Sequence, residues 1–167
     1  MRLKQTLAAI GLAALGTVSI HAAMAQEAQD DPGPAAYAGA LKDKRVVLVP
    51  MATGFDLAQG WNAFLKREVT AWGGVYDNKD PNWVTDAGTQ ALTDLINSEP
   101  TPNVLVVQPF DLNSYKKVLD KAHKKGIYVV LLDNPMNFPA DAYVGGDWDR
   151  LGQLEAEAAV KIGRAHV

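Results

Sequence analysis

Acidic, amide and aromatic side chains stand directly after several short apolar runs of the sequence. They are Phe55, Asp56, Gln108, Asp133, Asn134, Asp147 and Trp148. Carboxylate and amide groups can hydrogen-bond the paired hydroxyls of a small polar ligand, while an aromatic ring can cover its apolar face. This combination predicts a binding site for a polyhydroxylated molecule such as a sugar.

Several polar residues after the apolar runs also have a purely structural interpretation. Asp111 and Asp147 each precede an expected helix, where an acidic side chain is a common N-cap. We expect Asp111 to be such a cap and leave both roles open for Asp147. Asp133 and Asn134 precede Pro135 and could shape a turn. We favour ligand contact for them, because an apolar strand leads straight into both residues.

The remaining aromatic residues and histidine are assigned by their neighbours. Trp61 and Trp72 lie on the apolar face of an expected helix, so we expect both in the core. Trp148 is open between ligand contact and packing. His123 stands among lysines at the end of another helix and is expected at the solvated surface.

The sequence carries no recognisable catalytic apparatus. It has no phosphate-binding loop, dinucleotide fingerprint, nucleophile elbow, or histidine and cysteine cluster with metal-ligand spacing. We therefore expect a binding protein, not an enzyme, with no cofactor and no metal. Residues 26–167 hold 14 Lys and Arg against 19 Asp and Glu with no basic block, which argues against nucleic-acid binding.

From Lys44 onward, short β-branched runs alternate with segments of helical spacing. Strands are expected at 45–49, 75–76, 104–107, 127–132 and 143–144, and helices at 57–72, 84–96, 115–124 and 151–162. Fully apolar strands that alternate with helices are typical of βαβ units. The predicted fold class is α/β, a doubly wound parallel sheet, in which ligands bind beyond the carboxyl ends of the strands.

The first 25 residues have the features of an export signal. Arg2 and Lys4 precede an apolar run from 7 to 20, and Ala23-Met24-Ala25 offers a cleavage site. A membrane anchor is the alternative, but a spanning helix needs ~20 apolar residues and this run is shorter. We interpret 1–25 as a cleaved signal peptide, which predicts a periplasmic protein without membrane insertion. Residues 26–43 read as a flexible N-terminal segment.

Three later segments resemble a known family. They are Val104-Leu105-Val106-Val107-Gln108-Pro109, the strand from Lys125 to Asn134 that ends in Leu132-Asp133-Asn134, and Val144-Gly145-Gly146-Asp147-Trp148-Asp149-Arg150-Leu151-Gly152. Their order and spacing resemble the type I periplasmic solute-binding proteins of sugar ABC transporters, the ribose- and galactose-binding group.

The resemblance implies how the chain is divided and what each part does. Residues 44–146 would form the N-terminal lobe of a sugar-binding domain, and 147–163 would begin the second lobe. Gln108, Asp133 and Asn134 would touch the sugar, while the first loop would supply Phe55 for stacking and Asp56 as its polar partner. An inner-membrane permease would be the protein partner.

The chain departs from the family pattern in two places. Thr53-Gly54-Phe55-Asp56 stands where relatives often carry Asn-Pro and two aromatics, and Asn134 stands where ribose binders have arginine. These changes leave the particular sugar open and allow a sugar alcohol. A periplasmic sensor adaptor for a receptor kinase and a secreted flavodoxin-like enzyme are the alternative functions.

Family members run to about twice this length, so we expect a fragment that lacks most of the second lobe. The final residues do not resemble the family helix. We interpret 164–167 as a non-native tail, translated from a sequencing adapter.

Overall fold

The computed structural model describes residues 37–111 and 113–165. The expected signal peptide over 1–25 lies outside the described residues, as do residues 26–36 of the expected flexible segment and the last two residues of the expected tail. Within the described ranges, no helix combines the length and the apolar character that a membrane span requires.

Five parallel strands of the described residues form one sheet. They are β1 (Arg45–Val49), β2 (Val75–Asn78), β3 (Val104–Val107), β4 (Tyr128–Leu132) and β5 (Ala142–Val144), in the spatial order β2-β1-β3-β4-β5. β1 pairs with β2 on one side and with β3 on the other, with Val47 opposite both Asp77 and Leu105. The structure confirms the predicted parallel α/β sheet.

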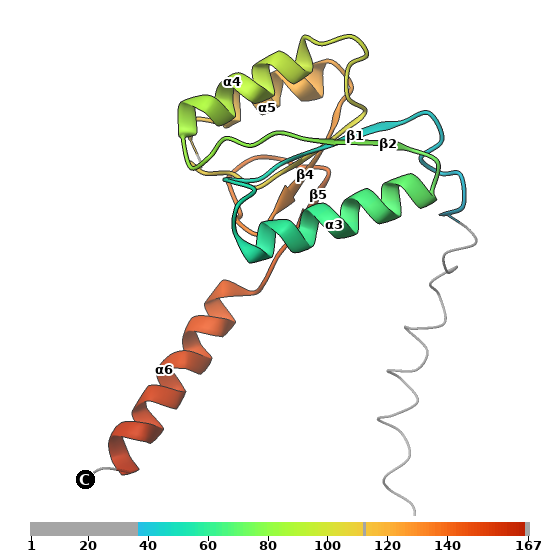
Figure 1. Ribbon diagram of the computed structural model, residues 1–167. Coiled ribbons are helices and arrows are strands. Elements are labelled where there is room, and N and C mark those ends of the chain that lie inside the picture. The colour runs from blue at the N-terminus through green and yellow to red at the C-terminus, as the bar shows by residue number, and fades with distance from the viewer. Residues whose placement is uncertain (1–36, 112, 166–167) are drawn as a thin grey trace, which may run out of the picture. The chain divides into compact units, whose positions relative to one another are not determined.

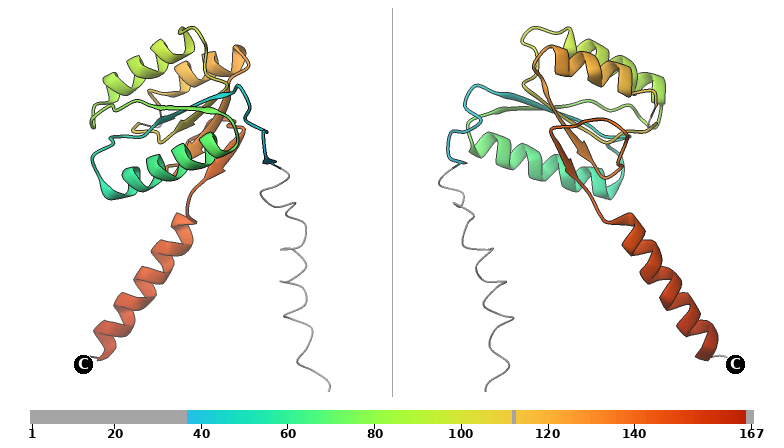
Figure 2. Two further views of the ribbon diagram at one scale, coloured as in Figure 1. Left: turned by 45° about the vertical axis from the view of Figure 1, so that its right-hand side comes forward. Right: turned by 180° about the vertical axis from the view of Figure 1, so that it is seen from behind.

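Helices cover both faces of the sheet (Figures 1 and 2). α4 (Thr85–Ile96) and α5 (Lys116–Lys124) pack on the face that includes Val47, and α3 (Asp56–Ala71) packs on the face that includes Leu48. The chain crosses from β1 to β2 in one direction and from β2 to β3 and β4 in the other. Crossovers of one hand therefore place α3 opposite α4 and α5.

The face that carries α3 is only partly covered within the described ranges. An apolar hollow of about 350 Å³ lies beside α3, lined by Trp61, Phe64, Leu65, Val106, Val130, Leu132 and Val144. Leu57 and Phe64 stand at helical spacing with the other apolar residues of α3, yet they are 51% and 55% exposed. Their side of the helix stays open because α3 lies over β1 and β2, and no further helix among the described residues closes the space beside it. Trp61 and Trp72 are half-buried, less than expected for core residues.

The last described helix and His123 of α5 both lie at the surface. α6 (Trp148–Ala165) follows β5, and its side chains over 148–163 are exposed. His123 is partly exposed at the surface, where its Nε2 lies 3.0 Å from Asp141 Oδ2 and its ring centroid 4.8 Å from that of Phe138. The chain after β4 returns over the end of α5 and supplies both partners.

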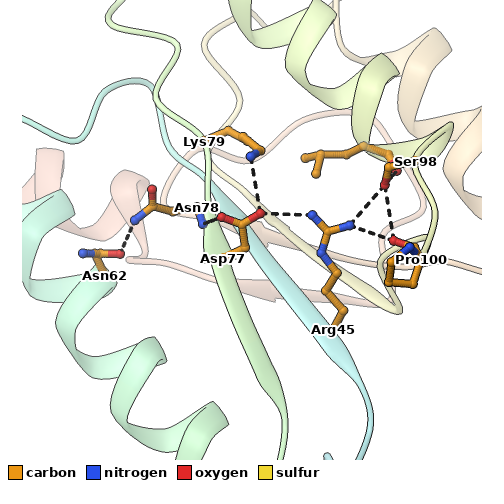
Figure 3. Close-up of polar contacts among 8 residues, drawn as sticks. Arg45, Asn62, Asp77, Asn78, Lys79, Ser98 and Pro100 are labelled. Carbon is orange, nitrogen blue, oxygen red and sulfur yellow. Dashed lines mark hydrogen bonds and ion pairs between the residues drawn. The ribbon is translucent and has the colours of Figure 1, made fainter.

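A polar network fastens the amino end of β1 (Figure 3). The Arg45 guanidinium donates to Asp77 Oδ2 at 3.0 Å, to Ser98 Oγ at 3.1 Å and to the Pro100 carbonyl at 2.7 Å. Burial acts to raise the pKa of Asp77, but the Arg45 hydrogen bond and the charge of Lys79 outweigh it and hold the pKa below its usual value. The network ties β2 and the α4–β3 connection to β1.

Candidate functional site

Gln108 follows β3 and is the buried centre of the carboxyl-end loops. Its side chain is 1% exposed, with Oε1 accepting from the Met51 backbone N–H at 3.1 Å and Nε2 donating to Asp133 Oδ2 at 3.0 Å. The amide therefore joins the loops that follow β1, β3 and β4. The Gln108 side chain therefore orients Asp133, and we call it the Gln108 bracket. Direct contact between Gln108 and a ligand stays a prediction.

The backbone of Asp133 is held from several directions. Its φ is +65°, a left-handed conformation that Asp tolerates better than most residues. Its N–H donates to the Val144 carbonyl at 2.8 Å, and its own carbonyl accepts from Tyr143 Oη at 2.8 Å and Trp148 Nε1 at 2.9 Å. A Cβ at Gly145 would lie 2.1 Å from Tyr143 Oη, so a larger residue there would displace the Tyr143 ring from this bond. The predicted site residues Asp133 and Trp148 are thus brought together.

Asn134 joins the same group through its side-chain amide. Nδ2 donates to the Pro109 carbonyl at 3.0 Å and lies 3.8 Å from Met51 Sδ. Gln108, Asp133 and Asn134 therefore lie close together, and Met51 contacts both Gln108 and Asn134. A partly exposed carboxylate beside amides is an arrangement that can accept hydrogen bonds from ligand hydroxyls.

The other acidic candidates are placed differently. Asp56 is exposed in the first turn of α3, where the helix dipole favours a carboxylate. Asp147 Oδ1 accepts from the Arg150 N–H at 2.9 Å and so caps α6, while its contact with a ligand stays a prediction. We expected Asp111 to cap α5. That prediction is wrong, because the helix begins only at Lys116. Asp111 closes the preceding turn, accepting from the Asn113 N–H at 2.9 Å.

An aromatic strip runs along the neighbouring loops. The Phe55 ring centroid lies 5.1 Å from that of Trp83, and Trp83 lies 6.4 Å from Phe110 in an edge arrangement. Phe55, Trp83 and Phe110 follow β1, β2 and β3 respectively. Phe55 was predicted from the sequence, whereas Trp83 was missed, since it lies outside both the apolar runs and the helical stripes. Its place soon after a strand, next to a proline turn, is the signal that could have found it.

The loop that carries Trp83 is tied to the loop after β1 by Asp80. The carboxylate accepts from the Thr53 N–H at 3.1 Å and the Asn82 N–H at 2.8 Å, and it also accepts from the Thr53 hydroxyl. These bonds, above all the one from the Thr53 hydroxyl, hold the pKa of Asp80 below its usual value. Asn82 and Trp83 both have positive φ, at 49° and 64°, which costs about 1–3 kcal/mol each. The Asp80 tie helps to maintain this conformation.

Metal chemistry finds no support in the part of the chain that the structure describes. No group of three or more His, Cys, Asp or Glu side chains there could hold a metal ion. The described site instead offers one carboxylate with amides and an aromatic strip, an arrangement suited to binding an uncharged polar molecule.

Comparisons with known proteins give the family. Residues 29–165 match the periplasmic binding protein domain. An ABC transporter solute binding protein from Mycobacterium smegmatis with bound glycerol is 26% identical with a TM-score of 0.58, and the match covers 63% of this chain and 36% of that one. One from Burkholderia graminis C4D1M in complex with D-arabinose is 22% identical with a TM-score of 0.67, covering 73% and 42%. No curated protein matches the chain significantly.

A third solved structure belongs to a signalling protein. The fructose binding periplasmic domain of a hybrid two component system is 15% identical with a TM-score of 0.66, and the match covers 72% of this chain and 40% of that one. The chain thus spans less than half the length of each of these structures. The parallel sheet and the match over residues 29–165 agree with the resemblance drawn from the sequence. The chain belongs to the periplasmic binding protein domain family, and its structural neighbours include the solute-binding proteins of sugar ABC transporters.

Proposed function

We propose that this chain is part of a periplasmic protein that captures a sugar or a related polyol for an ABC importer. The observation that carries the proposal is the Asp133 carboxylate, oriented by the buried Gln108 amide and adjoined by Asn134. The D-arabinose complex of the Burkholderia graminis relative supports the ligand class. The matched relatives are solute-binding proteins, and we propose binding without catalysis or a cofactor here too.

The site geometry suggests how capture works. Asp133 Oδ1 and Oδ2 can accept from adjacent hydroxyls, and hydrogen bonds to a charged group contribute about 1.5–3 kcal/mol. We place the N-terminal lobe at 44–146 and the start of the second lobe at 147–163, so closure of the second lobe would exclude water from these bonds. An inner-membrane permease would receive the ligand. Export by a signal peptide over 1–25 would bring the protein to the periplasm.

Ligand titration of the whole chain tests the proposal. Saturation-transfer-difference NMR with aldoses, including D-arabinose and D-glucose, and with their alditols detects weak binding. Asp133→Ala should weaken the affinity at least tenfold, which corresponds to about 1.4 kcal/mol. Asp94→Ala is the matched control, because this exposed carboxylate lies on α4, where its Oδ1 accepts from Gln90 Nε2 at 2.7 Å. The proposal fails if no aldose or alditol binds, or if Asp133→Ala binds as the wild type does.

A sensor adaptor for a receptor kinase is the second candidate. The likeness to the fructose binding domain of a two component system supports it, because that domain has the same fold. Both functions use the same ligand site and differ only in the membrane partner. Stimulation of a permease ATPase by the loaded protein would favour the importer, and stimulation of kinase autophosphorylation would favour the sensor.

A further inference from the structure

Trp83 is an exposed aromatic residue in a conformation that bulky side chains rarely adopt. It is 50% exposed and has a φ of +64° directly after Asn82, whose φ is +49°. Positive φ at a bulky residue is uncommon and persists only where the surroundings impose it. The loop therefore holds a large ring at the surface, although glycine or asparagine would adopt this backbone conformation with less strain.

The backbone contacts of Trp83 lead directly to the polar site. Its N–H donates to the Met51 carbonyl at 2.9 Å, and the Met51 N–H donates to Gln108 Oε1. Met51 Sδ also lies beside the Asn134 amide. One residue thus links the Trp83 loop to the Gln108 bracket that orients Asp133.

The Phe55 ring packs against the Trp83 ring. Its ring meets Trp61 edge-on at 6.3 Å and Trp83 at 5.1 Å with an interplanar angle of 37°. Phe55 is half-buried between these two rings, whereas Trp83 and Phe110 expose more of their surface. Within the strip, Trp83 therefore offers the larger open aromatic face to an incoming molecule.

We propose that Trp83 is a ligand-stacking residue that makes this site select ring-form sugars over open-chain polyols. The inference rests on the proposed function and deepens it. A pyranose or furanose ring presents a rigid patch of C–H groups that a flat indole can cover, while an alditol with the same hydroxyls has no such fixed face. Asp133 would recognise hydroxyls of either class, so discrimination comes from the indole.

The test compares each aldose with its alditol on two variants of Trp83. In saturation-transfer-difference NMR titrations of the whole chain, Trp83→Gly should weaken aldose binding about threefold to tenfold and leave alditol binding nearly unchanged. Trp83→Phe should recover part of the aldose affinity, because a smaller ring remains. Glycine accepts positive φ without strain, so the Trp83→Gly chain is expected to keep the fold. Thermal unfolding of each variant checks this.

Tyr128→Ala provides the matched control. Tyr128 is an aromatic residue with 62% exposure at the amino end of β4, away from the carboxyl-end loops. Its removal should leave both ligand classes unaffected. The inference is overturned if wild type and Trp83→Gly show the same aldose-to-alditol preference while Asp133→Ala still weakens binding. If wild type binds neither class, the proposed function itself fails.

Discussion

Replacing Gln108 by leucine tests whether the buried amide holds the site together. Leucine has nearly the same volume but can neither accept from the Met51 N–H nor donate to Asp133 Oδ2, the two bonds of 3.1 and 3.0 Å that Gln108 makes. A buried polar group left without its partner costs about 1–3 kcal/mol, and the partly exposed Asp133 carboxylate costs the lower end of that range because water can reach it. Part of this cost is recovered by burying an apolar side chain, so we expect the free energy of unfolding to fall by about 2–4 kcal/mol.

Urea unfolding followed by circular dichroism measures the effect. With a slope of about 1–3 kcal/mol per molar urea, the midpoint should fall by roughly 1 M or more. Gln90→Leu is the control, because Gln90 Nε2 donates to Asp94 Oδ1 at 2.7 Å on the exposed face of α4. We expect a change of less than about 0.5 kcal/mol there. If Gln108→Leu unfolds at the wild-type urea concentration, the bracket contributes nothing to stability and the reasoning is refuted.

Two further predictions concern a buried hydroxyl and an acid-sensitive tie. Tyr115 Oη is buried without a hydrogen-bond partner among the described residues, so Tyr115→Phe should leave thermal stability unchanged or raise it by about 1 kcal/mol. A loss of that size would contradict this assignment. The pKa of Asp80 lies below its ordinary 3.8, so its bonds stabilise the fold fully above that pH and are lost as the pH falls through the lowered pKa. Wild type should therefore be more stable than Asp80→Ala at neutral pH, and calorimetric melts should converge in acid; a difference that persists unchanged in acid would argue against the tie.

The fold could be predicted because β1, β3 and β4 are nearly continuous apolar runs. Val104–Val107 and the run that ends at Leu132 are apolar on both faces, so composition alone marks them as inner strands of a parallel sheet. The exposure of Phe64 could not be predicted, since a helical stripe shows which side of α3 is apolar but not how far the neighbouring layer extends.

The candidate site was predictable in its position and less so in its detail. Gln108, Asp133 and Asn134 directly follow strands of one parallel sheet, and the structure places them together at the carboxyl end. The sequence does not show that the Gln108 amide hydrogen-bonds to Met51 and Asp133, because these bonds depend on which loops meet in space. Trp83 was missed for a related reason, because its position depends on the bond from its N–H to the Met51 carbonyl, about thirty residues earlier along the chain.

The strand order has a consequence for how the sheet is assembled. β2 and β3 pair with β1, β4 pairs with β3, and β5 pairs with β4. Each strand after β1 thus pairs with a strand that precedes it in the chain, and none depends on a later strand for its first partner. A polypeptide that emerges amino end first, from a ribosome or a translocation channel, can add its strands in the order of their appearance.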